Sequence, residues 1–180
     1  SPEDVDSVVP NVFTGPLPRR AYAWVLERSL GGTIEEVVRL SNDPRFLTAV
    51  VPAGNLIATA NETSRFFELL LRDGELDGIR VFPRRAVRRA RVEQTYLELD
   101  TTIMLPVRYG MGLMLGGKWL SFYGPRTPMA FGHLGFTNVL AWADPERDIS
   151  VGFLQNGKPF ITPRLIRWAN VMQTIGDRFP

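Results

Sequence analysis

One short segment of the sequence combines the residue types that a catalytic site needs: Gly132-His133-Leu134-Gly135. A histidine side chain can accept or donate a proton near neutral pH, and flanking glycines let a substrate approach the backbone closely. His133 is the single histidine of the 180 residues. Because a lone histidine is more often structural than catalytic, packing remains the alternative role for this segment.

The composition excludes several other kinds of site. The sequence has no cysteine, which excludes a disulfide framework, a thiol nucleophile and cysteine-ligated metal centres. One histidine cannot form a multi-histidine site, so we expect neither a metal nor a cofactor. No run of about 18 apolar residues occurs, so we expect no membrane-spanning helix. The acidic start, Ser1-Pro2-Glu3-Asp4, is unlike a signal peptide and favours a cytoplasmic location.

A second group of polar residues is an arginine cluster within one eight-residue stretch: Arg84, Arg85, Arg88, Arg89 and Arg91. Such a cluster can bind the phosphates of a nucleic acid. The alternative is a solvated helix face whose charge is balanced by Glu93, Glu98 and Asp100. We favour the solvated face and expect no nucleic-acid partner, because no aromatic residues interleave with the arginines and the formal net charge is only +2.

The elements that position these residues follow from periodicity and capping patterns. The length and a hydrophobic fraction of 44% predict a single domain over residues 1–180. After an extended segment of about 18 residues, helical spacing predicts helices over 19–30, 33–40, 59–73 and 84–91, and one that begins at Thr162-Pro163. Strands are predicted over 79–82, 109–117, 136–143 and 149–155, with a hairpin loop over 144–148. Helices followed by a meander of three antiparallel strands and a closing helix give an α+β class.

Several segments, taken in their order, also carry a family resemblance: Pro52-Ala53-Gly54-Asn55-Leu56-Ile57-Ala58-Thr59-Ala60, Arg65-Phe66, Asp73-Gly74-Glu75-Leu76-Asp77-Gly78, Tyr109-Gly110-Met111-Gly112, Phe131-Gly132-His133-Leu134-Gly135-Phe136 and Ala143-Asp144-Pro145-Glu146-Arg147. Together they resemble serine hydrolases of the penicillin-recognising superfamily, the class C β-lactamase-like esterases and D-aminopeptidases. The resemblance covers roughly residues 50–160. It implies a β-lactamase-like fold whose five-stranded antiparallel sheet receives its last three strands and final helix from this chain.

The resemblance also assigns roles to individual residues. His133-Leu134-Gly135 matches the third motif of the family, Lys-Thr-Gly or His-x-Gly, which lines the substrate cleft opposite the nucleophile. The N–H of Phe136 would then be one of two oxyanion-hole donors, and His133 would hydrogen-bond the substrate or tune a catalytic tyrosine. Histidine in place of lysine favours neutral ester substrates, because it carries no permanent charge. Tyr109 and Tyr123 are candidate substrate-binding residues, together with Trp119 and Phe122, with core or loop packing as the equal alternative.

The other two family motifs do not occur in these residues. Leu115 and Gln155 precede Lys118 and Lys158 by three positions, so there is no Ser-x-x-Lys, and no tyrosine begins a Tyr-x-Asn or Tyr-x-Ser. We therefore expect the chain to be the C-terminal portion of a serine hydrolase of small esters or amides. A missing N-terminal segment of the same protein, or a second chain, would complete it. The alternative is a non-catalytic binding or scaffolding domain that keeps the fold.

Overall fold

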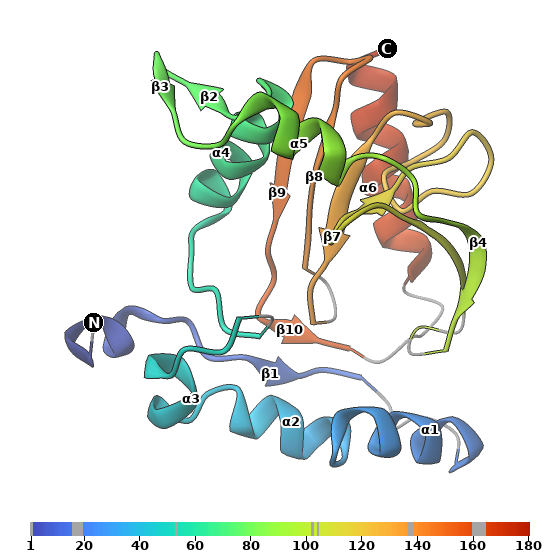
Figure 1. The fold of residues 1–180 in the computed structure, drawn as a ribbon. Coiled ribbons are helices and arrows are strands. Elements are labelled where there is room, and N and C mark those ends of the chain that lie inside the picture. Colours follow the sequence, from blue (N-terminus) through green and yellow to red (C-terminus); the bar gives the residue numbers. More distant parts are fainter. Residues whose placement is uncertain are drawn as a thin grey trace.

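The centre of the computed structural model is a six-stranded antiparallel sheet in which each strand lies beside the next one in the sequence (Figure 1). The strands are β4 (Thr95–Asp100), β5 (Leu105–Tyr109), β6 (Met114–Leu115), β7 (Phe131–Leu134), β8 (Leu140–Asp144) and β9 (Ile149–Phe153). The structure describes residues 2–15, 20–52, 54–101, 103, 105–136, 139–159 and 165–180. The predicted α+β class is confirmed.

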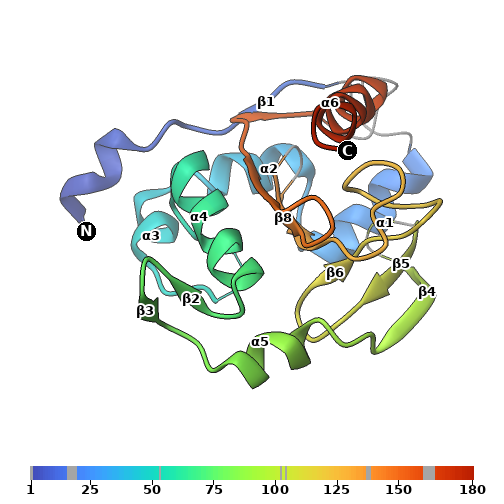
Figure 2. The same ribbon diagram turned by 90° about the horizontal axis from the view of Figure 1, so that it is seen from above.

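Two helices cover the two faces of this sheet. On one face, Phe67 of α4 (Ala60–Leu71) packs with the alternate residues Ala141 and Ala143 of β8. On the other face, Met172 of α6 (Leu165–Arg178) packs with Trp142. Figure 2 shows β8 between these two helices. Because successive side chains of a strand point to opposite faces, the completely buried β8 carries apolar residues on both.

The remaining elements lie at the two ends of the sheet (Figure 1). The lower end in that view carries α1 (Arg20–Leu30), α2 (Ile34–Leu40), α3 (Pro44–Thr48) and the parallel pair of β1 (Val12–Phe13) with β10 (Gly157–Lys158). The upper end carries α5 (Arg84–Ala90) and the hairpin of β2 (Glu75–Leu76) with β3 (Ile79–Arg80). A short 3-10 helix, η1 (Pro2–Ser7), lies near the start of the chain.

The capping patterns read from the sequence are present in the structure. The Thr59 hydroxyl accepts a 3.2 Å hydrogen bond from the Glu62 N–H, and the Glu62 carboxylate accepts a 2.8 Å bond from the Thr59 N–H. Thr33 and Glu36 form the same reciprocal pair at the start of α2. Each pair satisfies two backbone donors that a helix start leaves without partners. The predicted helices over 33–40 and 59–73 are thereby confirmed.

The strand predictions need correction in the middle of the chain. Residues 109–117 are not one strand: β5 ends at Tyr109, and the Gly110 N–H donates to the Leu113 carbonyl at 2.8 Å to close a turn. Gly112 occupies this turn at φ +77°, a conformation that glycine tolerates. The sheet also contains β4 and β5, which were not predicted. The exposed, charged residues of β4 and the proline within β5 weaken the strand signal there.

Smaller differences lie near the two ends. The expected extended start contains η1, and Asp43 begins an unpredicted helix α3 by accepting a 2.8 Å hydrogen bond from the Arg45 N–H. The predicted start of the last helix at Thr162-Pro163 falls outside the described residues. Among the helices that the structure describes, none combines the length and apolar character that crossing a membrane requires.

Candidate active site at the end of strand β7

The candidate histidine lies on the face of the sheet that α4 covers. His133 of β7 is in register with Ala141 of β8, and Ala141 is in register with Gly152 of β9. A Cβ added to Gly152 would lie 2.2 Å from the carbonyl oxygen of Ala60, so the first turn of α4 rests directly on this row. The start of α4 lies over β9, and His133 lies on β7 in the same row, two strands away across the sheet.

The ring of His133 is exposed and is held by its own strand. Its Nδ1 lies 2.5 Å from the carbonyl oxygen of Leu134. Because a carbonyl oxygen can only accept, this contact requires the proton on Nδ1. Nε2 of the neutral ring is then an acceptor. The ring can accept a hydrogen bond from a hydroxyl group that approaches the strand.

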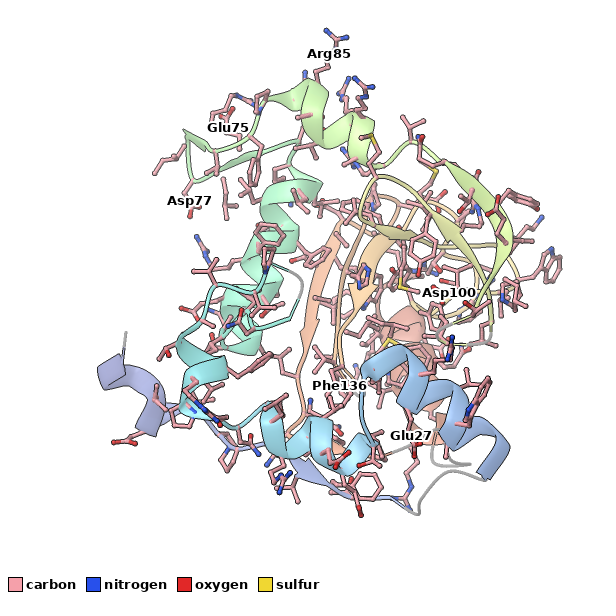
Figure 3. The ribbon with its side chains drawn as sticks, turned by 60° about the horizontal axis from the view of Figure 1, so that its bottom comes forward. Glu27, Glu75, Asp77, Arg85, Asp100 and Phe136 are labelled. Carbon is pink, nitrogen blue, oxygen red and sulfur yellow. The ribbon has the colours of Figure 1, made fainter. Side chains whose placement is uncertain are left out.

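The two residues after Leu134 turn the chain toward β8. The Gly135 N–H donates to the Val139 carbonyl at 2.9 Å. The half-buried Phe136 side chain packs against Ile34 and Val38 of α2, which fixes the backbone at this point. Figure 3 shows Phe136 beside α2 at the end of the sheet. Within the described part of the chain, no group accepts a hydrogen bond from the Phe136 N–H.

The glycines of this segment have a packing reason as well. A Cβ on Gly132 would lie 2.2 Å from the Ala141 carbonyl oxygen and 2.5 Å from the Cβ of Trp142. A Cβ on Gly135 would lie 2.8 Å from Cγ1 of Val139. All three distances are shorter than real Cβ contacts allow. The close approach of β7 and its turn to β8 therefore requires glycine at both positions.

The structure does not bring the candidate tyrosines to His133. Tyr123 is 1% exposed, its hydroxyl donates to the Met114 carbonyl at 2.9 Å, and its ring stacks on Trp142. Tyr109 packs against the same cluster, on the α6 face of the sheet. Its hydroxyl donates to Oδ2 of Asp100 at 2.6 Å. These positions favour the packing alternative for both tyrosines.

The other two aromatic candidates also lie away from the histidine row. Phe122 makes an edge contact with Trp168 of α6, with ring centroids 6.2 Å apart. Trp119 is 89% exposed, with the Lys118 amino group 5.6 Å from its ring centroid. Neither side chain lies in a common pocket with His133, and neither brings Tyr109 or Tyr123 to it. The structure thus separates the predicted site into the end of β7 and a packing cluster under α6.

A buried lysine is the ionisable residue whose position the sequence did not reveal. Lys158 of β10 is 3% exposed, and its Nζ donates to the Gln155 carbonyl at 2.7 Å. Burial lowers the pKa of this amino group because removal from water disfavours the charged form. In the sequence, Lys158 was considered only in the search for a Ser-x-x-Lys motif, which it does not complete because no serine lies three positions before it. Across the described ranges, no group of three or more His, Asp or Glu side chains could hold a metal ion.

The arginine cluster lies on α5, at the end of the sheet away from α2 (Figure 1). Its balancing carboxylate is Asp73, which accepts from Arg84 Nε at 3.1 Å, from Arg88 and from Arg91. The expectation that Glu93, Glu98 and Asp100 balance the cluster is therefore corrected. Glu93 pairs with Arg108, and Asp100 accepts from Tyr109. Asp73 was missed because it lies before the hairpin in the sequence.

Comparisons with known proteins agree on one family. A sequence model of the family described as Beta-lactamase matches residues 9–175. The chain is 26% identical over 120 residues to the esterase/beta-lactamase LipL of Mycobacterium tuberculosis, covering 67% of this chain and 27% of that protein. The family VIII carboxylesterase structure has a TM-score of 0.63 at 22% identity, over 75% of this chain and 36% of that chain. A penicillin-binding protein homolog from Caulobacter crescentus has a TM-score of 0.53 at 29% identity, over 62% and 30%. The chain thus spans between 27% and 36% of the length of these relatives.

Proposed function

The chain belongs to the beta-lactamase family, and on this premise we propose that it is part of a serine hydrolase that cleaves esters through a covalent acyl-enzyme. The observation that carries the proposal is the end of β7. There, an exposed histidine with a free ring acceptor stands three residues before a backbone N–H that no described group engages. In this proposal the chain supplies the third active-site motif and an oxyanion-hole donor, and the nucleophile comes from outside the 180 residues.

The two groups act at different atoms of the reaction. A serine oxygen attacks the carbonyl carbon of the ester, and the Phe136 N–H donates to the carbonyl oxygen as that oxygen gains negative charge. The alcohol leaves with a proton, and water then releases the acid from the acyl-serine. His133 Nε2 accepts a hydrogen bond from a hydroxyl of the substrate or of a catalytic tyrosine. Packing of Phe136 on α2 holds the amide in position before the reaction.

The preference for esters follows from the third motif. A lysine at the position of His133 would place a permanent positive charge beside the substrate and favour substrates that carry a carboxylate. A histidine at this position carries no permanent charge. The names of two relatives, an esterase/beta-lactamase and a family VIII carboxylesterase, support an ester substrate.

The partner in this proposal is an upstream segment of the same protein, which adds a strand to β9. In the described residues β9 pairs with β8 alone, so its other edge has backbone donors and acceptors available. All five residues of β9 are only half-buried. An open, largely apolar edge favours pairing with a further strand. Hydrogen exchange checks this step: outward-facing amides of 149–153 should exchange fast in the 180-residue chain and slowly after the upstream segment is joined.

The activity test compares the 180-residue chain with the protein extended upstream to include a Ser-x-x-Lys segment. We expect no hydrolysis of nitrophenyl acetate or butyrate above background by the chain alone, because the activated serine is absent. The extended protein should hydrolyse these esters with a higher kcat/KM than it shows for a chromogenic cephalosporin. Turnover by the chain alone, with a serine-directed phosphonate attached to one of its own serines, would contradict the division of the site.

The absence of Ser-x-x-Lys and Tyr-x-Asn from these residues favours a second candidate, a non-catalytic binding or scaffolding domain. The same experiment separates the two. If the upstream region of the natural protein encodes neither motif and the extended protein hydrolyses none of the substrates, the non-catalytic function stands. If both motifs are encoded and their serine is acylated, the hydrolase stands.

A further inference from the structure

The segment from Ile79 to Val92 has a composition found nowhere else in this chain. It contains no acidic residue and six arginines: Arg80, Arg84, Arg85, Arg88, Arg89 and Arg91. Aliphatic residues alternate with the arginines throughout it. The two features together, clustered cations and interspersed apolar residues, indicate a surface that meets a negatively charged and partly apolar partner.

The structure turns most of these cations to one side. Val87 is 4% exposed and anchors α5 to the body of the protein. On the outward side, four arginines and Val92 line a shallow, open hollow of about 630 Å³: Arg84, Arg85, Arg88 and Arg89. They form two i, i+4 pairs, so the guanidinium groups stand in two neighbouring rows on the helix. Figure 3 shows Arg85 extending away from the body of the protein.

Nearby carboxylates leave part of this charge uncompensated. Asp73 binds Arg84, Arg88 and Arg91, and two other nearby acids are already paired, Glu75 with Arg80 and Asp77 with Arg65. Among the residues that the structure describes, none forms an ion pair with Arg85 or Arg89. The outward face of α5 therefore presents guanidinium groups that lack an internal counter-charge.

Exposed aliphatic side chains accompany the arginines. Val92 is 55% exposed at the hollow, and Ile79 and Val81, in and just after β3, are 66% and 54% exposed. Figure 1 shows the β2–β3 hairpin and α5 together at one end of the molecule. Apolar residues with this exposure beside arginines are typical of surfaces that bind at the interface of a lipid bilayer.

We propose that α5 and the β2–β3 hairpin form a docking surface for an anionic lipid bilayer. The arginines of the hollow bind lipid phosphates, which the guanidinium fork fits through two parallel hydrogen bonds. Ile79 and Val81 enter the boundary between headgroups and acyl chains. A nucleic acid fits less well, because no aromatic residue lines the hollow to stack on bases and the aliphatic residues would have no apolar partner.

The test measures co-sedimentation of the purified 180-residue chain, and of the protein extended upstream, with two kinds of vesicle. One kind is phosphatidylcholine alone, and the other also contains phosphatidylglycerol. The test variant is Arg85→Glu with Arg89→Glu, since neither residue is in an ion pair that folding needs. The matched control is Arg39→Glu with Arg167→Glu, two exposed arginines on α2 and α6 with the same change in net charge. Circular dichroism establishes that every variant is folded.

We expect the chain to bind only the vesicles that contain phosphatidylglycerol. The Arg85/Arg89 variant should weaken this binding about tenfold or more, and the control variant should leave it unchanged. Ile79→Ser with Val81→Ser should weaken binding several-fold.

Equal binding of the control and test variants, binding to both vesicles alike, or no binding at about 0.1 M salt would overturn the proposal. Displacement from vesicles by millimolar inorganic phosphate would show a free-phosphate site, and tighter binding to a random DNA duplex than to vesicles would show a nucleic-acid surface; either result would overturn the bilayer as partner.

Discussion

The guanidinium of Arg147 donates a 2.6 Å hydrogen bond to the carboxylate of Asp144, and the side chains are 9% and 0% exposed. Asp144 also accepts from the Glu146 N–H at 3.0 Å, and Arg147 donates to the Arg126 carbonyl at 3.0 Å. The pair therefore joins the turn between β8 and β9 to the loop that leads into β7. It holds both ends of the hairpin from which the candidate histidine projects.

Replacing Asp144 with alanine should lower the free energy of unfolding by about 3–5 kcal/mol, because Arg147 is left buried without its counter-charge. Urea denaturation followed by circular dichroism measures the change. The control is Asp77→Asn, which breaks the ion pair between Asp77 and Arg65. Their side chains are 66% and 49% exposed, respectively. An exposed pair contributes little, so this control should barely move the midpoint. Equal midpoints for the two variants would contradict a structural role for the buried pair.

Gly132→Ala should destabilise the fold by about 1–3 kcal/mol or more, because its Cβ would meet backbone and Trp142 atoms that have no room to move. Gly176→Ala is the matched glycine control: it lies within α6 with open space around it. That replacement should stabilise the chain by up to about 1 kcal/mol, since alanine favours a helix. Thermal and urea unfolding check both signs. A Gly132→Ala variant as stable as the parent would show that β7 and β8 are farther apart than described.

The stability of the chain should fall as the pH rises above about 10. Burial and the nearby Asp100 carboxylate raise the pKa of Tyr109 above its ordinary value. The folded state therefore retains a proton that the unfolded state loses in this range. Tyr109→Phe removes this term, so its unfolding free energy should fall less steeply above pH 10. At pH 8 the tyrosine is protonated in both the folded and the unfolded state. There Tyr109→Phe should lower the free energy of unfolding by only about 1 kcal/mol, for the lost hydrogen bond. Parallel slopes for variant and parent would refute the assignment.

His133→Ala should lower kcat/KM for nitrophenyl esters by about 10- to 1000-fold in the protein completed by its upstream segment. Folding should be unaffected, because the side chain is exposed and its Nδ1 contacts the Leu134 carbonyl of the same strand. Tyr109→Phe serves as the comparison, since Tyr109 lies on the other face of the sheet and should leave kcat/KM unchanged. Stopped assays with purified variants of equal thermal stability measure both. Unchanged kinetics for His133→Ala would make the histidine a structural residue.

Helices α2 and α4 were predictable because their signals are local. A capping box such as Thr59 with Glu62 is complete within four residues, and both such boxes are present in the structure. The sheet was harder, because strand pairing depends on partners distant in the sequence. The predicted strand over 136–143 is wrong at its start, because β7 ends at Leu134 and β8 begins only at Leu140. The Gly- and Pro-rich loop before residue 131 weakens the strand signal of β7 in the sequence.

The candidate site was only partly predictable for a similar reason. His133, Gly135 and Phe136 are neighbours in the sequence, so any extended backbone keeps them together. Whether Tyr109 and Tyr123 reach the same place depends on which face of the sheet each one occupies. A shift of one residue in the pairing register of a strand reverses that face. The predicted strand over 109–117 misses the turn at Gly110 that follows β5, and Tyr123 lies in the loop before β7, where no strand alternation sets its direction.

The consecutive order of β4 to β9 has a consequence for how the molecule assembles. Each strand pairs with its neighbour in sequence, so the sheet can grow strand by strand, and its longest connection is the loop over 116–130 between β6 and β7. The β1–β10 pair differs: Asn156 donates to the Pro10 carbonyl across 146 residues. Its closure spans the longest stretch of chain and so has the largest entropy cost, for a ladder of only two residue pairs. We therefore expect the central sheet to form early and the junction of the two chain ends last, with amides of β8 protected before those of β1 in pulsed hydrogen exchange.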